Sequence, residues 1–283
     1  MSLKENPKGV SGRRWKFMAP PPDEMDAMIR GGVYGPVAKI LSGRGVKAAD
    51  AAWFLDPKIS QSIPPSGTFP GMTEAVELFS DVVMRNARIG IWTDYDCDGA
   101  TSAATLGRFL RMCGHDDFVI RVPDRISEGY GPNRPGIDDL FEGKQCDTVF
   151  VLDSGTVATG VFNPMPAERR ARIAVIDHHL PGDTLPEIAA VVNPNRKDQA
   201  PGLGHLCAAG VTFFFCIEAV KELSRRGHIF PVRPNMTDLL DIVALGTVAD
   251  VVPLTGVNRA IVTRGLRVMN DNPCVSIQEL LFA

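Results

Sequence analysis

The chain has 283 residues, 45% of them hydrophobic and 22% charged, which is enough apolar material for a core and excludes wholesale disorder. No stretch of about 18 apolar residues is free of charge, so no membrane span is expected, and the polar, basic amino end lacks a secretory signal. The net charge of -3 gives no overall basic field of the kind common in nucleic-acid binders, although metal ions or local basic clusters can still support such a ligand.

Short helical patterns separated by proline and glycine occupy the first 70 residues. Residues 36–45 predict a helix closed by glycine, and residues 48–57 predict a short helix stopped by Pro57. Residues 61–72 contain three prolines and two glycines, which is typical of a loop or a boundary. We therefore expect residues 1–70 to form a small helical and loop segment.

From Thr73 onwards, apolar strands alternate with helical patterns. Residues 73–87 have the period of a helix, with Thr73 as its expected cap. The alternation predicts an α/β fold with a mostly parallel sheet and helices on both faces. The expected strands are 87–94, 117–123, 146–155, 171–179 and 189–194, and the expected later helices are 100–114, 206–223, 235–250 and 258–270.

The six cysteines never occur as a CxxC pair. Several of them lie in apolar runs, where a thiol behaves as a small hydrophobic side chain. We therefore expect reduced core thiols in a cytoplasmic protein.

Three of the expected strands end in acidic residues. In open parallel sheets, ligands bind beyond the carboxyl ends of the strands, so the coincidence predicts a polar site at that edge. The residues concerned are Asp94, Asp96 and Asp98 after the first strand, Asp153 after the third, and Asp177, His178 and His179 after the fourth.

The first acidic group places three negative charges in one short loop. Such charges repel each other strongly in a partly dry site, so Asp94, Asp96 and Asp98 indicate bound cations, and their alternation lets them serve more than one metal. The ordinary alternative is a solvated turn or a helix-capping run. The twelfth position of a calcium-binding EF-hand loop would be Thr105, which argues against that site.

The adjacent histidines form the second half of the pattern. The chain has only five histidines, and two in a row after an apolar strand are unusual in a soluble core. Neighbouring side chains on a strand point to opposite faces, but the turn at a strand end can bring both towards one site. We expect one of His178 and His179 to ligate a metal and the other to contact a phosphate or support a ligand. A structural role is the alternative.

Two further acids fit the same site. Asp153 is placed to bridge two ions, although aspartate is also a common turn residue. Asp250 ends an apolar helix, where the helix dipole opposes a negative charge, so we expect a metal or a base to compensate it; the alternative is a solvated terminal acid. Carboxylate and imidazole without thiolate favour Mn²⁺ or Mg²⁺ over structural zinc. Two such ions can orient a water and stabilise a phosphoryl transition state, which predicts a two-metal phosphoesterase.

Residues 123–136 are unusually rich in glycine and proline, which disfavours a regular element and favours a binding loop. Arg125 is expected to bind a phosphate with its forked guanidinium, and Tyr130 to stack on or hydrogen-bond to a substrate. The alternative is an ordinary surface loop in which Arg125 pairs with Glu128.

Together these blocks resemble the DHH phosphoesterase superfamily, and within it the RecJ-like single-strand-specific exonucleases. The resemblance runs from about Val37 to the carboxyl end, and Cys97, where the family often has alanine, removes no ligand. The blocks that carry it include DYDCDGATSAATL, RISEGYGPN, VFVLDSGT, VIDHHLPG, VVNPN, LCAAGV and LGTVADVVPLTGVNR.

The resemblance implies a role for each acidic and histidine position. His179 would lie nearest the scissile phosphate, Asp177 would support the histidine pair, and Arg125 would hold a backbone phosphate. Asp153 would bridge the two ions. The implied metal ligands are Asp94, Asp96, Asp98, Asp153, His178 and Asp250.

The resemblance also implies the domain layout: a DHH domain over residues 71–252 and a connecting helix over residues 253–283. RecJ-like enzymes usually continue into a second domain with a glycine- and histidine-rich motif and then an oligonucleotide-binding fold. We therefore expect the chain to be a catalytic core or a trimmed relative.

The implied function is hydrolysis of single-stranded DNA from its 5′ end, in DNA repair and recombination, by a water that two Mn²⁺ or Mg²⁺ ions activate. The implied partners are single-stranded DNA, a single-strand-binding protein and a helicase, with no membrane. Two alternatives stay open. One is a phosphoesterase that acts on short oligoribonucleotides or cyclic dinucleotides, and the other is a DHH scaffold that binds nucleic acid without catalysis.

Overall fold

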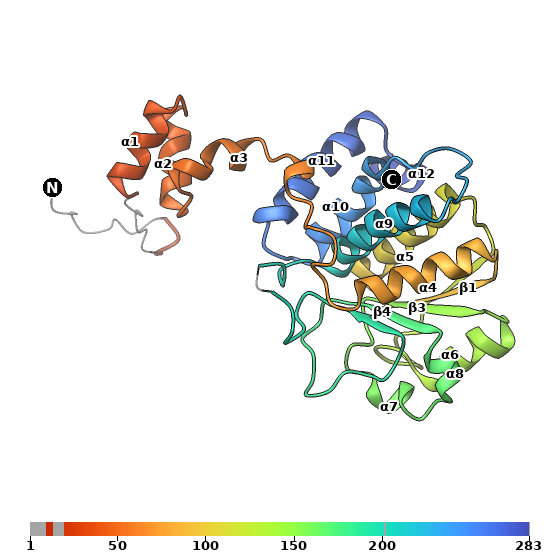
Figure 1. Ribbon diagram of the computed structural model, residues 1–283. Helices are drawn as coiled ribbons and strands as arrows, with labels where there is room; N and C mark the ends of the chain where they lie inside the picture. The colour runs from red at the N-terminus through yellow and green to blue at the C-terminus, as the bar shows by residue number, and fades with distance from the viewer. Residues whose placement is uncertain (1–9, 14–19, 201, 283) are drawn as a thin grey trace. The chain divides into compact units, whose positions relative to one another are not determined.

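The computed structural model describes residues 10–13, 20–200 and 202–282 (Figure 1). The chain divides into two compact units, residues 1–58 and 59–283. The larger unit contains the sheet and every acidic and histidine position predicted for the site.

The smaller unit is helical. It contains α1 (Pro22–Arg30), α2 (Gly35–Gly43), the 3₁₀ turn η1 (Ala48–Asp50) and α3 (Ala51–Leu55). Proline stands in the first turn of both α1 and α2, where a missing N–H leaves no hydrogen bond unmade. Its small core comprises Met28, Ala38, Leu41 and Ala51. The helices predicted over residues 36–45 and 48–57 are confirmed, whereas α1 was not anticipated.

A five-stranded parallel sheet organises the larger unit, with strand order β2-β1-β3-β4-β5. Four of its strands are buried along their whole length, which explains why they are almost continuously apolar in the sequence. This confirms the predicted α/β class and all five predicted strands. The strands are β1 (Ile89–Thr93), β2 (Phe118–Arg121), β3 (Thr148–Leu152), β4 (Ile173–Ile176) and β5 (Ala190–Val192).

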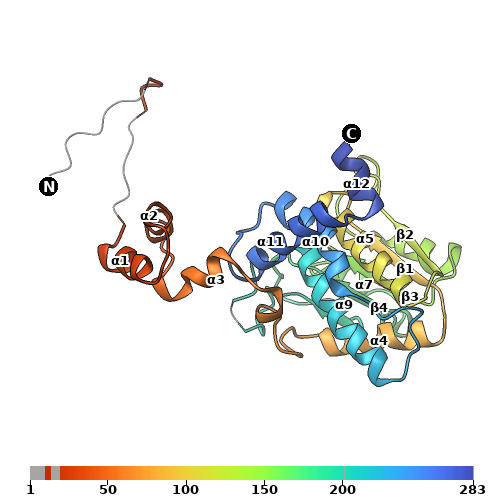
Figure 2. The ribbon, with the colours of Figure 1, turned by 90° about the horizontal axis from the view of Figure 1, so that it is seen from above.

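The long helices cover one face of the sheet (Figures 1 and 2). α9 packs against α4, α5 and α10, and α10 packs against α11. Phe79 is fully buried among other aromatic side chains, and its ring meets that of Phe215 edge-on at 5.3 Å; burial of each such side chain stabilises the fold by about 1.5–3 kcal/mol. The helices are α4 (Met72–Met84), α5 (Cys97–Met112), α9 (Ala208–Arg225), η4 (Met236–Leu239), α10 (Leu240–Ala249) and α11 (Gly256–Asp271).

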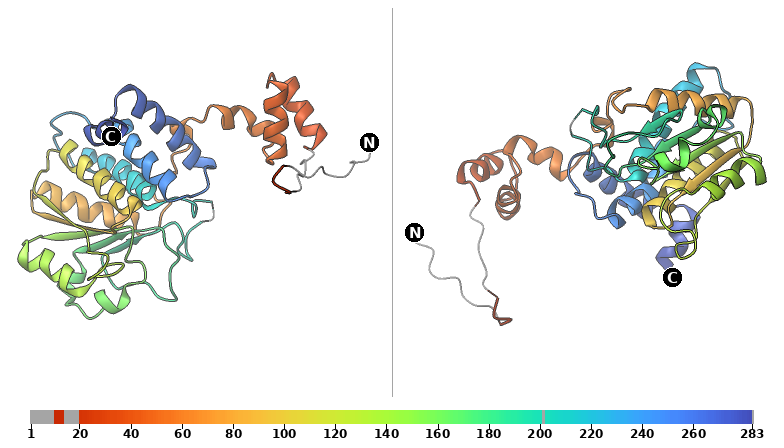
Figure 3. Two further views of the ribbon diagram at one scale, coloured as in Figure 1. Left: turned by 180° about the vertical axis from the view of Figure 1, so that it is seen from behind. Right: turned by 90° about the horizontal axis from the view of Figure 1, so that it is seen from below.

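Short helices cover the opposite face (Figure 3). Trp92 of β1 and Val151 of β3 pack there with Ile137 and Phe162. These elements were not anticipated, because one or two turns are too short to show a helical period. They are α6 (Arg134–Asp138), the π-helical turn η3 (Asp139–Gly143), α7 (Thr159–Phe162) and α8 (Ala167–Arg170).

Two details differ from the sequence-based expectations. Residues 59–70, with the turn η2 (Ile59–Gln61), were assigned to the amino-terminal segment, but Ile59 and Phe69 pack in the main core of the larger unit. Thr73 does not cap α4, because the helix begins one residue earlier, after Gly71 in a left-handed conformation with φ of 77°. A side chain at Gly71 would lie 2.6 Å from the carbonyl oxygen of Val191, so the close approach to β5 selects glycine there.

The carboxyl-terminal part, expected as a connecting helix, consists of α11 and α12 (Val275–Phe282), and α11 packs along α10. None of the described helices is long and apolar enough to cross a membrane. All six cysteines are free thiols; four are buried, Cys97 is exposed, and Cys274 is intermediate.

Candidate metal centre

The predicted acidic and histidine side chains converge at the carboxyl edge of the sheet. β1, β3 and β4 are neighbours, so the residues that follow them lie side by side. Three groups of possible metal ligands form there, and in each group the ligand atoms lie within 4.8 Å of one another. The groups are Asp94, Asp96 and Asp153; Asp98, His178 and Asp250; and Asp153, His178 and His179.

The loop between β1 and α5, together with the first turn of α5, presents the first three acids. Asp96 is the N-cap of α5, and one of its carboxylate oxygens accepts a hydrogen bond from the Gly99 N–H at 3.0 Å. A side chain at Gly99 would lie 2.4 Å from the carbonyl oxygen of Asp94, so only glycine allows the loop to close this tightly. The helix-capping alternative is therefore correct for Asp96, without removing it from the cluster.

Asp98 points from the first turn of α5 towards the start of α9. Its two oxygens accept hydrogen bonds from the N–H groups of Ala208 and Ala209 at 2.6 and 3.0 Å. Burial raises the pKa of Asp98, and these two hydrogen bonds oppose that rise. His178 Nε2 lies 3.6 Å from Asp98 Oδ2, so the amino end of α9 orients a buried carboxylate towards the histidine.

Asp153 follows β3 in a left-handed backbone conformation with φ of 56°, which is uncommon for a residue with a side chain. Its side chain is almost fully buried. Burial, followed by the charges of Asp98 and Asp96, raises the pKa of Asp153 to about 10. Without cations, this carboxyl group therefore keeps its proton at neutral pH.

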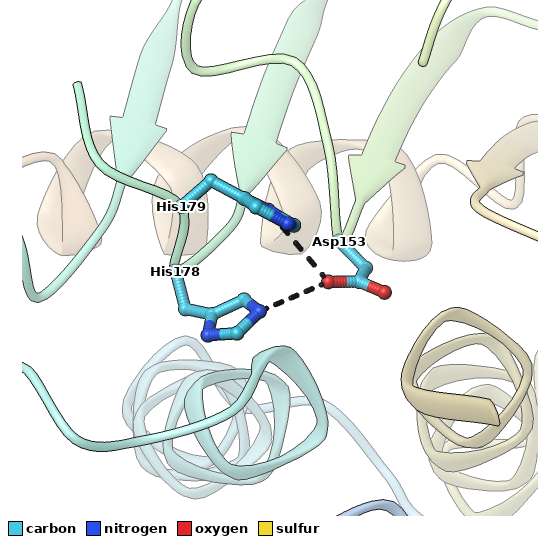
Figure 4. Close-up of side chains that lie close together, drawn as sticks. All are labelled: Asp153, His178 and His179. Atoms are coloured by element: carbon cyan, nitrogen blue, oxygen red, sulfur yellow. Dashed lines mark ion pairs between the residues drawn. The ribbon is translucent and has the colours of Figure 1, made fainter. Parts of the chain in front are cut away.

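His178 and His179 both turn towards Asp153 (Figure 4). His178 Nε2 lies 3.3 Å from Asp153 Oδ1, and His179 Nδ1 lies 4.0 Å from the same oxygen. Asp177, which begins this turn, is buried and accepts hydrogen bonds from the backbone N–H groups of both histidines and from His179 Nδ1 at 2.8 Å. The turn thus brings both imidazoles to one site, as expected for the pair.

The environment of Asp177 contrasts with that of Asp153. Burial opposes ionisation of Asp177, but its hydrogen bonds with His179 and Thr156 outweigh burial and lower its pKa to about 2. The hydrogen bond that His179 donates to Asp177 also raises the pKa of His179. Asp177 is therefore an ionised support for the histidine turn, and none of the three ligand groups includes it.

Two asparagines hold the histidine turn from the loop after β5, and sequence reasoning assigned them no role. The side-chain amide of Asn193 donates to the carbonyl oxygen of His179 at 2.8 Å and to Thr156 Oγ1 at 2.8 Å. The amide of Asn195 donates to the carbonyl oxygen of His178 at 2.5 Å. The available signal was the NPN segment, residues 193–195, directly after a strand that ends at the same edge of the sheet.

Asp250 comes to the cluster from α10. Its Oδ2 lies 3.8 Å from His178 Nε2, and burial, followed by the charge of Asp98, raises its pKa. A side chain at Gly246 would lie 2.2 Å from Thr101 Oγ1, so glycine permits α10 to approach α5 closely enough. Val251 has φ of 58°, an outlier for a β-branched residue, so the backbone is strained directly after the acid.

Three carboxylate oxygens of the cluster accept no hydrogen bond from any residue that the structure describes. They are Asp94 Oδ1, Asp153 Oδ1 and Asp250 Oδ2, and all three atoms are buried. Burial is also the main cause of the raised pKa of Asp94. Unpaired buried carboxylate oxygens are destabilising unless a cation or a proton neutralises them. Because these oxygens face two imidazoles and further carboxylates, the donor set fits hard divalent cations such as Mn²⁺ or Mg²⁺.

The loop 123–133 lies beside this cluster, and the last residues of the predicted loop, 134–136, begin α6 instead. Tyr130 Oη is 3.1 Å from His179 Nε2, and burial, with the neighbouring acids, raises the pKa of Tyr130 well above its usual range, so the phenol keeps its proton. Glu128 pairs with Arg121 at 2.8 Å, which corrects the pairing of Glu128 with Arg125 considered from the sequence. The guanidinium of Arg125 lies over the ring of Tyr95 instead, 5.1 Å from its centroid.

Comparison with known proteins places the chain in a family. Residues 88–247 match the DHH family, N-terminal domain, so the chain belongs to the DHH family. It is 38% identical over 209 residues to the single-stranded-DNA-specific exonuclease RecJ of Dickeya dadantii, covering 72% of this chain and 36% of that protein. It is 30% identical over 275 residues to the Bacillus subtilis protein of the same name, covering 96% of this chain and 33% of that protein. The chain thus spans about a third of the length of these relatives.

Two solved structures are similar in fold. A crystal structure of exonuclease RecJ bound to manganese is 29% identical, with a TM-score of 0.61, over 75% of this chain and 51% of that chain. The crystal structure of RecJ from Thermus thermophilus in complex with Mn²⁺ is 26% identical, with a TM-score of 0.67, over 93% of this chain and 36% of that chain.

Proposed function

We propose that this chain contains the catalytic domain of a metal-dependent nuclease that releases nucleotides from the 5′ end of single-stranded DNA. The observation that carries the proposal is the set of buried carboxylate oxygens without a hydrogen-bond donor among the described residues, which gather with His178 and His179 at the carboxyl edge of the sheet. The names of the relatives and the manganese in their structures support the same reaction and cofactor.

In this proposal the predicted ligands would hold two Mn²⁺ or Mg²⁺ ions, and Asp153, which belongs to two of the three ligand groups, would serve both. When bound, such ions lower the pKa of a water and neutralise charge on the phosphodiester. The group of Asp94, Asp96 and Asp153 and the group of Asp98, His178 and Asp250 are the two candidate positions, and Asp153 Oδ1 also lies near His178.

The protein's own groups would orient the phosphodiester. Asp177 fixes the His179 ring through the hydrogen bond to Nδ1, which leaves Nε2 directed at Tyr130 and the open side of the cluster. His179 is half-exposed, so it can meet a scissile phosphate and donate a hydrogen bond to it. Tyr130 and Arg125 supply further donors on the same side.

The direct test uses single-stranded oligonucleotides labelled at either end, with Mn²⁺ or Mg²⁺. We expect stepwise release from the 5′ end that EDTA abolishes and that Asp153→Ala lowers by about 10³-fold, since the ions supply several kcal/mol of transition-state stabilisation. Asp147→Ala, at the opposite edge of the sheet, is the matched control and should cleave normally. Metal-dependent release from the 3′ end, or no cleavage of any single strand, would contradict the proposal.

The same assay separates the alternative substrates. Rates on a long DNA strand, a short oligoribonucleotide and a cyclic dinucleotide are compared at equal concentration. Faster hydrolysis of either small substrate would replace DNA as the substrate class, and binding of DNA without hydrolysis of any of them would make the domain a scaffold.

We extend the proposal to the cellular setting. The free thiols fit a reducing cytoplasm, where an enzyme of this kind would act in DNA repair and recombination. A helicase would supply the single strand and a single-strand-binding protein would cover it. Co-purification of either partner with the full-length protein from its own cells tests this part.

A further inference from the structure

Two arginines beside the metal centre each lie over an aromatic ring, but they differ in their other contacts. The guanidinium of Arg121 is 5.0 Å from the centroid of Trp92 and also pairs with Glu128 at 2.8 Å. The guanidinium of Arg125 is 5.1 Å from the centroid of Tyr95. Among the residues that the structure describes, Arg125 has no ion pair or hydrogen bond, so the donors of Arg125 are open whereas those of Arg121 are engaged.

The backbone of the loop that contains Arg125, residues 123–133, is held by contacts that do not involve the Arg125 side chain. Glu128 accepts hydrogen bonds from Arg121, from the side-chain amide of Asn133 at 3.2 Å and from the backbone N–H of Asp124 at 2.9 Å. These contacts fix the start and the end of the loop. Within the described part of the chain, they leave the guanidinium of the exposed Arg125 with a ring contact to Tyr95 and a charge interaction with Asp94.

Tyr95 belongs to the metal-binding loop itself. It stands between Asp94, which is buried, and Asp96, which caps α5. Its neighbours therefore fix its backbone, and its half-buried ring keeps a constant place relative to the acidic cluster. A guanidinium stacked on this ring is therefore also held in a fixed position relative to the acidic cluster.

We propose that Tyr95 is a positioning residue, which holds the guanidinium of Arg125 through a cation–π contact so that its free N–H edge binds a backbone phosphate next to the metal centre. The proposal rests on the proposed nuclease function and adds a residue to it. A planar guanidinium can lie face-on against a ring while its edge forms a forked pair with a phosphate. The ring also restricts the side chain before the substrate arrives, which lowers the entropic cost of binding.

A double-mutant cycle tests the coupling. Binding of a fluorescent oligothymidylate is measured by anisotropy for the parent chain, Tyr95→Leu, Arg125→Ala and the double variant, all carrying Asp153→Asn so that the strand is not cut. We expect Arg125→Ala to weaken binding by about tenfold or more and to reduce the salt dependence of log Kd by about 0.7, the loss of one phosphate contact. Tyr95→Leu should weaken binding about two- to fivefold.

The coupling between the Tyr95 and Arg125 substitutions decides whether the proposal holds. Tyr95→Leu should have almost no further effect once Arg125 is alanine, and Tyr95→Phe, which keeps the ring, should recover the affinity that Tyr95→Leu loses. Equal effects of Tyr95→Leu with and without Arg125 would overturn the proposal. So would a matching loss of Mn²⁺ affinity in Tyr95→Leu made in the otherwise unsubstituted chain, because Tyr95 would then act on the metal loop. Absence of metal-dependent cleavage by the unsubstituted chain would instead reject the proposed function.

Discussion

Acids at the two ends of β3 lie in opposite environments. At the amino end, Asp147 pairs with Arg85 at 2.8 Å, and this hydrogen bond lowers its pKa. At the carboxyl end, Asp153 is buried, its Oδ1 has no hydrogen-bond partner among the described residues, and its pKa is raised to about 10. Without any bound ligand, the folded chain stabilises Asp147 in its ionised form, whereas the buried carboxyl group of Asp153 needs a proton or a cation to neutralise its charge. The carboxyl edge is therefore built for a ligand at a cost in stability.

Replacing each of the two acids in turn should give the largest difference in cleavage rate. Asp153→Asn removes a charged ligand and should lower metal-dependent cleavage by about 10³-fold, whereas Asp147→Asn should leave it within about twofold. Initial rates on a labelled single strand at saturating Mn²⁺ provide the measurement. Similar losses in the two variants would mean that Asp153 acts only through the fold.

The asparagine that holds the histidine turn gives the next largest effect. Asn193→Ala removes hydrogen bonds to His179 and Thr156, so we expect a loss of about 10²-fold in rate from misplacement of the imidazole. The free energy of unfolding should fall by about 1–3 kcal/mol, because buried partners are left unpaired. Asn163→Ala, whose amide oxygen accepts a hydrogen bond at an exposed site, is the control for both measurements. An Asn193→Ala enzyme with full activity would separate the turn from catalysis.

Cations should stabilise the carboxyl edge of the folded chain. Mn²⁺ at about 100 times its Kd adds about 2.7 kcal/mol per site, which corresponds to a rise in Tm of roughly 5–10 °C for a unit of this size. Differential scanning calorimetry with and without EDTA measures the rise. In Asp153→Asn the rise should shrink, and an equal rise in that variant would place the cations elsewhere.

In the metal-free chain, the contributions of Asp153 and Asp147 to the free energy of unfolding should change with pH in opposite directions. Because the folded pKa of Asp153 is raised, its contribution to stability is present below about pH 4, the unfolded value, and is lost as the pH rises towards 10. Asp153→Asn should therefore become progressively more stable than the parent across this window. Asp147 has a lowered pKa, so its contribution, at most about 1 kcal/mol for a half-exposed pair, is present above about pH 4 and is lost below it.

Urea unfolding of the three proteins in EDTA, from about pH 2 to pH 9, measures both trends, that of Asp147 below about pH 4 and that of Asp153 above it. A parent chain that gains stability over Asp153→Asn as the pH rises would contradict the unpaired, buried state of Asp153. The Asp147→Asn variant serves as the internal control for general effects of charge removal.

The sequence predicted the parts of the site that local patterns encode. Apolar runs ending in acid located β1, β3 and β4, and the parallel arrangement then required Asp94, Asp153 and His178 to meet at one edge. Asp250, which follows a helix far along the chain, was singled out as an acid at an unfavourable helix end, and the resemblance then assigned it to the metal ligands. The short helices of the second face were missed, because they have too few residues for a period.

Contacts between segments that are distant in the chain could not be predicted from the sequence. The hydrogen bonds from the amino end of α9 to Asp98 and from Asn193 to the histidine turn depend on how loops meet in space. The alternative in which Glu128 pairs with Arg125 is not found, for the same reason: Arg125 is nearer in sequence, but Glu128 pairs with Arg121 at the end of β2.

Titration of the metal-free chain with Mn²⁺, followed by calorimetry and electron paramagnetic resonance, tests whether the acidic and histidine residues form a metal centre. We predict two ions per chain with magnetic coupling between them, and loss of that coupling in Asp153→Asn. Failure of the chain to bind Mn²⁺, or the same two coupled ions after substitution of Asp153, would contradict it.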